Sequence, residues 1–190
     1  KAMMGYPVQS DSMFAVTQEA VAEGIPVLGY ATEWDGIEAA LLIDNYQDGL
    51  QLGTDAGEWI VEHYGDKEVP LFLYSYYETD LGIERSEGIK DGLKEAGANV
   101  AIAESSTLSV KDSYDAAVNQ LAANPDTALW LATGSDQMIG AHRALMDHGV
   151  APDDSNYLLG ALDATEESLD LIEAKDSIWR LGFILPSNEL

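Results

Sequence analysis

The sequence predicts an α/β protein built on a doubly wound parallel sheet. Short apolar runs of strand length alternate about six times with longer segments whose apolar residues recur at helical spacing. Most of these helical segments end at a glycine or, in one case, at Asn124-Pro125. Polar residues collect where the apolar runs end, and in an open parallel sheet ligands bind outside those strand ends. These observations predict helices on both faces of the sheet and one crevice for a small molecule.

The first predicted strand covers residues 2–6, and Ser10 or Asp11 is expected to cap the helix that follows. Helical spacing predicts a buried stripe at Met13, Val16 and Ala20. Gly24 supplies the left-handed stop that ends the helix. The next apolar runs, residues 25–30 and 39–43, are predicted to be strands.

A long helix is predicted after residue 45, and Gly65 ends it. Its stripe consists of Leu50, Gly53, Gly57, Ile60 and Tyr64. A glycine inside a helix costs about 1 kcal/mol relative to alanine, so two of them on one face indicate close packing against the sheet. Residues 71–76 form the next predicted strand.

The remaining elements repeat the same plan. The predicted strands cover residues 100–103, 128–132, 157–162 and 178–185. The helices between them are expected to begin at Thr79 or Asp80, at Ser109 with Asp112 in an approximate capping box, at Ser135 or Asp136, and at Asp163 or Thr165.

Composition limits the function. The 190 residues include 34 Asp and Glu but only 9 Lys and Arg, which gives a formal net charge of −25. Nucleic-acid backbones and anionic lipid surfaces are bound through Lys and Arg, so this segment is not expected to bind nucleic acid or membranes. Most of the carboxylates are interpreted as a solvated acidic surface.

The sequence contains no cysteine and no recognised catalytic or nucleotide-binding motif. The histidines, His63, His142 and His148, are interpreted as surface or helix-terminus residues, and residues 44–49 lack the glutamate that ends a calcium loop. No pair of carboxylates stands at a catalytic spacing. The sequence therefore predicts no enzyme, no metal and no cofactor.

The candidate ligand-binding residues lie at or after the ends of predicted strands. Arg85 offers a rigid fork of five N–H donors, and Asp163 offers two acceptor oxygens. The other candidates are polar or aromatic residues at the same strand ends, Ser135, Asp136, Tyr30, Trp34, Tyr76 and Tyr77. Aromatic rings stack on the apolar face of a sugar, although core packing would explain the rings equally well and a structural ion pair would explain Arg85.

Several stretches resemble the type I periplasmic binding proteins of sugar transporters, whose fold is shared with the effector domains of LacI-type repressors. They are residues 24–27, 43–46, 84–88, 124–126, 135–138, 140–145 and 160–163. Their order and spacing match this family along nearly all of the chain. The resemblance implies two α/β lobes around a hinge that close on a ligand between them.

Under this resemblance the chain is expected to be a fragment with an incomplete first lobe. Residues 1–47 would form part of the first lobe, residues 48–185 the second lobe, and residues 186–190 the start of a return crossover. Any targeting segment or membrane anchor would lie outside the sequence.

The family's ligand-binding arginine falls on Arg85 and its ligand-binding aspartate on Asp163, with Ser135 near the usual asparagine. Other family positions differ, being occupied by Ala31, Thr32, Leu108 and Ile184. Unpaired buried polar groups cost about 1–3 kcal/mol, so the ligand is expected to differ from a simple pentose or hexose held in the common manner.

Two functions follow from the resemblance. The first is an extracytoplasmic solute-binding protein, in the periplasm or tethered to the outer face of the membrane, that delivers a sugar or sugar-like ligand to the permease of an ABC transporter. The second is the effector-binding domain of a LacI-type repressor. The acidic composition favours the first.

Overall fold

The computed structural model describes residues 1–7, 10–175 and 177–184, and it divides the chain into two compact units. Unit 1 is Lys1–Asp44 and unit 2 is Asn45–Leu190. The boundary expected from the sequence, after residue 47, falls within the first helix of unit 2. The crossover expected at residues 186–190, Pro186 included, lies outside the described residues.

Unit 1 is a small parallel sheet of strand order β1-β2-β3, with one helix. Its elements are β1 (Met3–Gly5), the 3-10 turn η1 (Ser10–Met13), α1 (Phe14–Ala22), β2 (Val27–Ala31) and β3 (Ala39–Leu42). In the parallel register, Gly5 pairs with Gly29. Gly24 has a φ of +72°, as expected for a left-handed helix stop.

Two details of the predicted first helix are wrong. Ser10 and Asp11 lie in the 3-10 turn, and the α-helix begins only at Phe14. Val16 is 42% exposed, whereas its neighbour Thr17 is fully buried. The reason is a polar contact inside unit 1, because the Thr17 Oγ1 accepts a hydrogen bond of 2.7 Å from the indole of Trp34.

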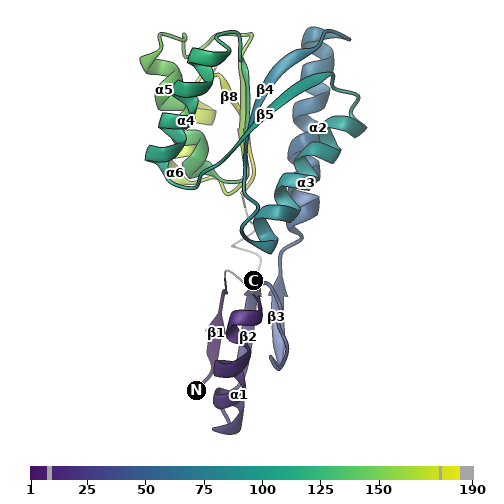
Figure 1. The fold of residues 1–190 in the computed structure, drawn as a ribbon, viewed down its shortest axis with the longest axis vertical. Coiled ribbons are helices and arrows are strands. Elements are labelled where there is room, and N and C mark those ends of the chain that lie inside the picture. Colours follow the sequence, from purple (N-terminus) through teal and green to yellow (C-terminus); the bar gives the residue numbers. More distant parts are fainter. Residues whose placement is uncertain (8–9, 176, 185–190) are drawn as a thin grey trace. The chain divides into compact units, whose positions relative to one another are not determined.

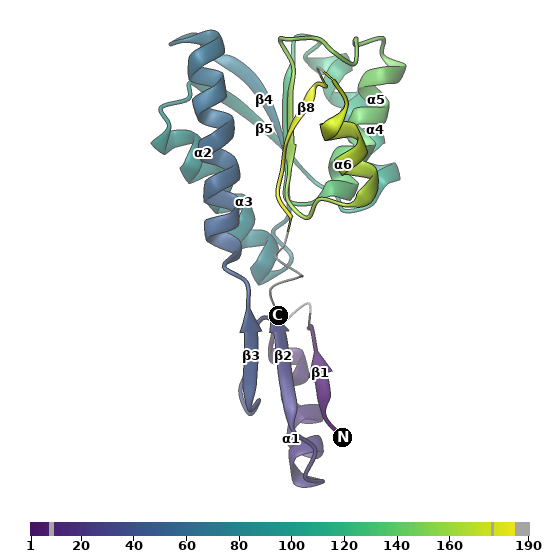
Figure 2. The ribbon, with the colours of Figure 1, turned by 180° about the vertical axis from the view of Figure 1, so that it is seen from behind.

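Unit 2 contains a five-stranded sheet of order β5-β4-β6-β7-β8, and all neighbouring strands are parallel. The strands are β4 (Val69–Ser75), β5 (Val100–Ser106), β6 (Leu129–Ala132), β7 (Leu158–Ala161) and β8 (Trp179–Gly182). The helices are α2 (Asn45–Tyr64), α3 (Asp80–Glu95), α4 (Val110–Ala123), α5 (Ser135–Asp147) and α6 (Glu166–Glu173). Figures 1 and 2 show α2 and α3 on one face of this sheet and α4, α5 and α6 on the other.

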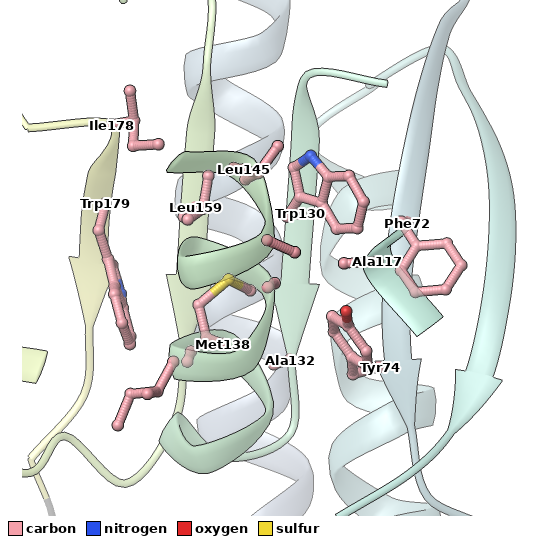
Figure 3. Close-up of a cluster of buried hydrophobic side chains, with 14 of the residues drawn as sticks. Phe72, Tyr74, Ala117, Trp130, Ala132, Met138, Leu145, Leu159, Ile178 and Trp179 are labelled. Carbon is pink, nitrogen blue, oxygen red and sulfur yellow. The ribbon is translucent and has the colours of Figure 1, made fainter. Parts of the chain in front are cut away.

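The strands divide their side chains between two cores because successive residues of a strand point to opposite faces. In β4, Leu71 and Leu73 join the core beneath α2 and α3, whereas Phe72 and Tyr74 join the core beneath α4 and α5. Figure 3 shows this second core, where the rings of Phe72, Tyr74 and Trp130 lie together and Met138 of α5 packs nearby.

The helices on the first face pack through glycines. A Cβ added at Gly49 or Gly53 of α2 would overlap the carbonyl oxygen of Arg85 or Ile89 of α3, and one added at Gly92 would lie 2.6 Å from the backbone nitrogen of Thr54. The backbones of α2 and α3 therefore touch directly. The glycines predicted to allow close packing do so, but against a neighbouring helix and not against the sheet.

Side-chain caps set the beginnings of three helices in unit 2. Thr79, Ser109 and Thr165 accept hydrogen bonds from the backbone N–H three residues later, and Thr165 forms a capping box with Ser168. The cap expected at Ser135 or Asp136 is wrong, because Gly134 occupies the N-cap and makes no side-chain bond. Ser135 uses its hydroxyl elsewhere.

The strand order creates a switch point between β4 and β6. From β4 the chain passes to β5 on one side, and from β5 it returns past β4 to β6. The loops that follow these two strands diverge at their carboxyl ends, which is where open α/β sheets bind ligands. No helix of the described residues is long and apolar enough to cross a membrane.

Candidate ligand-binding site

A cavity of about 340 Å³ lies in unit 2 at the carboxyl ends of β4, β6 and β7. This volume falls in the range of pockets that hold small molecules, roughly 300–1,000 Å³. The lining residues come from the segments that follow these three strands and from the loop after β5, and they are Tyr76, Leu81, Gly82, Arg85, Leu108, Thr133, Gly134, Ser135, Asp136, Gln137, Asp163 and Thr165.

Arg85 lies in α3 with its side chain only 3% exposed. Its Nε donates to the Oδ1 of Asn45 at 3.1 Å, and its Nη1 donates to the carbonyl oxygen of Thr133 at 3.0 Å. Nη1 and Nη2 both donate to the carboxylate of Asp163, the Nη2 bond being 3.0 Å long. This two-bond pairing joins the guanidinium and the carboxylate side by side in a defined geometry.

Asp163 follows β7 and has a side chain that is 42% exposed, so one end of the ion pair faces solvent. Its φ of +56° lies in the left-handed region, which aspartate tolerates better than most residues. Arg85 and Asp163 are 78 positions apart, and the parallel sheet brings them together. The sequence-based expectation that they share one opening at the strand ends agrees with this geometry.

A chain of hydrogen bonds extends from Arg85 beneath the cavity. The Thr133 Oγ1 donates to Gln137 at 3.0 Å, and the Gln137 Nε2 donates to the carbonyl oxygen of Thr107. Thr107 and Ser113 share a bond of 2.7 Å between their hydroxyls. Among the described residues, no buried side-chain nitrogen or oxygen lacks a partner, so the polar floor of the cavity is preorganised.

The buried Tyr74 adds a further hydrogen bond to this network, from the side of the core. Burial raises the pKa of Tyr74, so the phenol stays protonated and donates to the Ser113 carbonyl oxygen at 2.6 Å. The floor therefore joins β4, β6, α4 and α5 into one connected network.

Three other predicted residues line the cavity. The Ser135 Oγ donates to the carbonyl oxygen of Leu162 at 3.1 Å, which ties α5 to the end of β7. Asp136 is exposed in the first turn of α5, where the helix dipole favours a negative charge. The hydroxyl of Tyr76 donates to Glu78 at 3.4 Å, and desolvation followed by the Glu78 carboxylate raises the Tyr76 pKa.

The structure does not place Tyr77 in the cavity. The residue is 40% exposed, its hydroxyl donates to Glu104 at 3.0 Å, and the Lys90 ammonium lies 5.1 Å from the ring centre. These contacts join α3 to β5, so they are structural.

Tyr30 and Trp34 belong to unit 1. Trp34 is only 8% exposed, and its N–H is bonded to Thr17, which favours a core role over ligand stacking. Tyr30 is half-buried and meets Tyr6 edge to face at 6.0 Å between ring centres.

Sequence reasoning missed Asn45, Thr133 and Gln137. Thr133 directly follows β6 and Gln137 lies one turn into α5, so the strand-end rule that selected Ser135 would have found both. Asn45 also follows a strand, β3, but nothing in the sequence linked it to Arg85, which lies 40 positions further along the chain. In the described part of the chain, no group of three or more His, Cys, Asp or Glu side chains is placed to hold a metal ion.

Solved structures with the same fold come from several bacteria. A protein from Mycobacterium smegmatis in complex with β-D-fucofuranose has a TM-score of 0.72 and 21% identity, and the match covers 90% of this chain and 58% of that one. An ABC transporter periplasmic solute-binding protein from Actinobacillus succinogenes with bound D-allose has a TM-score of 0.75 and 20% identity, covering 93% and 63%. An ABC transporter solute-binding protein from Agrobacterium vitis with bound allitol has a TM-score of 0.71 and 17% identity, covering 94% and 61%.

The chain thus spans less than two thirds of the length of these structures. No curated protein matches it. The model of one protein family, described as the periplasmic binding protein domain, matches residues 2–181. The predicted type I α/β fold is confirmed, and the match along nearly the whole sequence shows that this chain belongs to the periplasmic binding protein domain family.

Proposed function

We propose that the cavity of unit 2 binds a sugar or a sugar-like polyol, and that the chain is part of an extracytoplasmic solute-binding protein of an ABC transporter. The observation that carries this proposal is the Arg85–Asp163 pair in a cavity that has a preorganised polar floor. It supplies hydrogen-bond donors and acceptors side by side, as a hydroxyl requires.

The number of N–H groups that Arg85 can still offer to a ligand supports a neutral ligand. A guanidinium has five N–H groups, and the bonds of Arg85 to Asn45, Thr133 and Asp163 use four of them. An anionic ligand would have to displace Asp163 to gain a two-bond contact and would also meet the charge of Asp136. A hydroxyl can instead accept the remaining N–H while it donates to the Asp163 carboxylate.

The cavity also offers apolar surface. Tyr76, Leu81 and Leu108 line it together with the polar residues. Sugar rings and polyols present C–H groups as well as hydroxyls. The C–H groups pack favourably on apolar or aromatic surface. The related structures with β-D-fucofuranose, D-allose and allitol support the same ligand class.

The transport role extends the proposal beyond the cavity. The family and its solved members support a membrane permease as partner and a location outside the cytoplasm. The net charge of −25 supports the view that this segment does not bind nucleic acid. Catalysis is not part of the proposal, since the cavity is explained by binding alone.

The first test is a thermal-shift screen of the intact protein against sugars, polyols, nucleosides and amino acids. A specific ligand stabilises the folded state by mass action, and we expect a sugar or polyol to give the largest shift. Stabilisation by an amino acid or nucleoside alone would overturn the proposed ligand class. Ligand-dependent binding of the intact protein to DNA would favour the repressor alternative.

The second test is calorimetry with the sugar or polyol that the screen identifies. Arg85→Ala and Asp163→Asn should each weaken binding by about 1.5–3 kcal/mol, the range for hydrogen bonds that involve charge. Arg143→Ala is the matched control, because Arg143 is an exposed arginine whose 2.7 Å bond to Glu167 lies outside the cavity. Unchanged affinity in both cavity variants would remove this pair from the site.

A further inference from the structure

A buried amide that does not line the cavity holds the guanidinium of Arg85. The Oδ1 of Asn45 accepts the Nε–H at 3.1 Å, and the two residues are only 3% and 2% exposed. Asn45 is the first residue of α2 and directly follows Asp44, the last residue of unit 1. The guanidinium is therefore tied to the first residue of unit 2.

Close helix packing makes this contact possible. A Cβ added at Gly49, one turn after Asn45, would lie only 3.0 Å from the Cα of Arg85 and would overlap its carbonyl oxygen. On the other helix, a Cβ at Gly88 would lie 2.8 Å from the backbone nitrogen of Leu50. The first turns of α2 thus rest on the turn of α3 that carries Arg85.

The bond at Nε determines which way the rest of the guanidinium faces. With Nε held by Asn45, Nη1 and Nη2 point to Thr133 and to Asp163. Without the amide oxygen, Nε–H would be a buried donor with its partner removed, and rotation of the planar group toward another acceptor would disturb the pairing with Asp163.

We propose that Asn45 is a positioning residue for ligand binding, with Gly49 setting the distance at which it reaches Arg85. The proposal rests on the proposed sugar-binding function of the cavity. Asn45 need not touch the ligand, because it acts by fixing the plane of the group that does.

The test compares Asn45→Ala, Asn45→Asp and Thr127→Ala in the intact protein. Aspartate has nearly the same shape as asparagine and keeps an acceptor oxygen at the same position, so Asn45→Asp serves as the rescue variant. Thr127 is the matched control, since it is fully buried and accepts a 3.0 Å bond from Gln120, but it precedes β6 at the opposite end of that strand from the cavity.

Two measurements are made on each variant. The first is the NMR signal of the Arg85 Nε–H, assigned by its loss in Arg85→Lys. The second is the dissociation constant for D-allose. We expect Asn45→Ala to shift the Nε–H signal, to speed its exchange with solvent and to raise the dissociation constant about tenfold. Asn45→Asp should restore both properties, and Thr127→Ala should change neither.

The proposal is overturned if Asn45→Ala leaves the Nε–H signal and its exchange unchanged, or if Asn45→Asp fails to restore them. These comparisons need no sugar, so they separate the positioning role from the proposed function. If the wild-type protein binds neither D-allose nor any other sugar or polyol, the proposed function fails while the Nε–H comparison still decides the role of Asn45.

A glycine pair tests the same role if Asn45→Ala does not fold. Gly49→Ala should displace the Arg85 backbone and change its Nε–H signal. Gly57→Ala introduces a similar crowding, with the new Cβ 2.6 Å from the Cβ of Ala96, but at the other end of the helix pair. Equal Nε–H changes in both variants would contradict a specific link between the start of α2 and Arg85.

Discussion

The two faces of the sheet in unit 2 are covered in different ways. On one face, large rings fill the space beneath α4 and α5, and Trp130 and Trp179 are fully buried there. On the other face, the core is aliphatic, and α2 and α3 touch each other through glycine positions such as Gly53 and Gly92. Large rings fill the first face, whereas on the second face glycines let two helices touch above an aliphatic core.

The difference bears on Arg85, the arginine of α3 that we propose to bind the ligand. The backbones of α2 and α3 are in direct contact, and Gly49 of α2 meets the backbone of Arg85 itself. The glycine face therefore gives Arg85 a rigid support, whereas the aromatic face supplies stability.

Trp130→Ala tests the aromatic face and should have the largest effect. The indole lies 5.2 Å from the Phe72 ring and donates to the Thr127 carbonyl oxygen at 3.1 Å. Its removal leaves a cavity, and we expect the free energy of unfolding to fall by about 3–5 kcal/mol in denaturant titrations. Trp59→Ala is the control, because Trp59 is only half-buried and should lose clearly less stability. Equal losses would contradict the assigned importance of the aromatic core.

Gly53→Ala tests the glycine face, with an intermediate effect. The new methyl would overlap the carbonyl oxygen of Ile89 and force the helices apart. Overpacking of this kind costs about 1–3 kcal/mol, which outweighs the gain in helix propensity from alanine. The exposed Glu58→Ala in the same helix is the control for chemical denaturation. A Gly53→Ala variant as stable as the wild type would show that the helices separate without cost.

The smallest effect is expected from His142 on the aromatic face. Burial lowers its pKa, the nearby Arg143 lowers it further and Glu167 opposes the shift. The folded state then binds fewer protons than the unfolded state, whose histidine has a pKa of about 6.5. The free energy of unfolding should fall as the pH drops below about 6.5, and more so in the wild type than in His142→Asn.

Thermal melts between pH 5 and pH 8 would measure this difference. Other titrating groups affect both proteins alike, so the comparison isolates His142. Identical pH profiles in the two proteins would show that the imidazole is not destabilised by its surroundings.

The sequence predicted unit 2 well and unit 1 less well. In unit 2 the inner strands β4, β6 and β7 are almost entirely apolar and the caps at Thr79, Ser109 and Thr165 are local, so pattern and structure coincide. In unit 1 the inner face of α1 carries a polar residue, Thr17, and a helical stripe of apolar residues pointed instead to Val16. A pattern of hydrophobicity cannot reveal a buried threonine whose partner lies 17 positions away.

Some residues of the candidate site could be predicted from the sequence, and others could not. Arg85, Ser135 and Asp163 could be found because each follows a strand of a parallel sheet and the carboxyl ends of such strands meet at one edge. Asn45 also follows a predicted strand, residues 39–43, but its role depends on how closely two helices approach. Gly53 and Gly57 indicated close packing, but not which partner they would pack against, and Gly49, which meets Arg85, was not in the predicted stripe.

The left-handed backbone at Asp163, with φ at +56°, limits which residues can replace it. Asparagine and glycine adopt this conformation readily, whereas branched or bulky side chains do so only with strain. An amide can thus be exchanged for the carboxylate while the loop keeps its shape. A single substitution can therefore change the charge beside Arg85 while the backbone of the loop and the fold stay as they are.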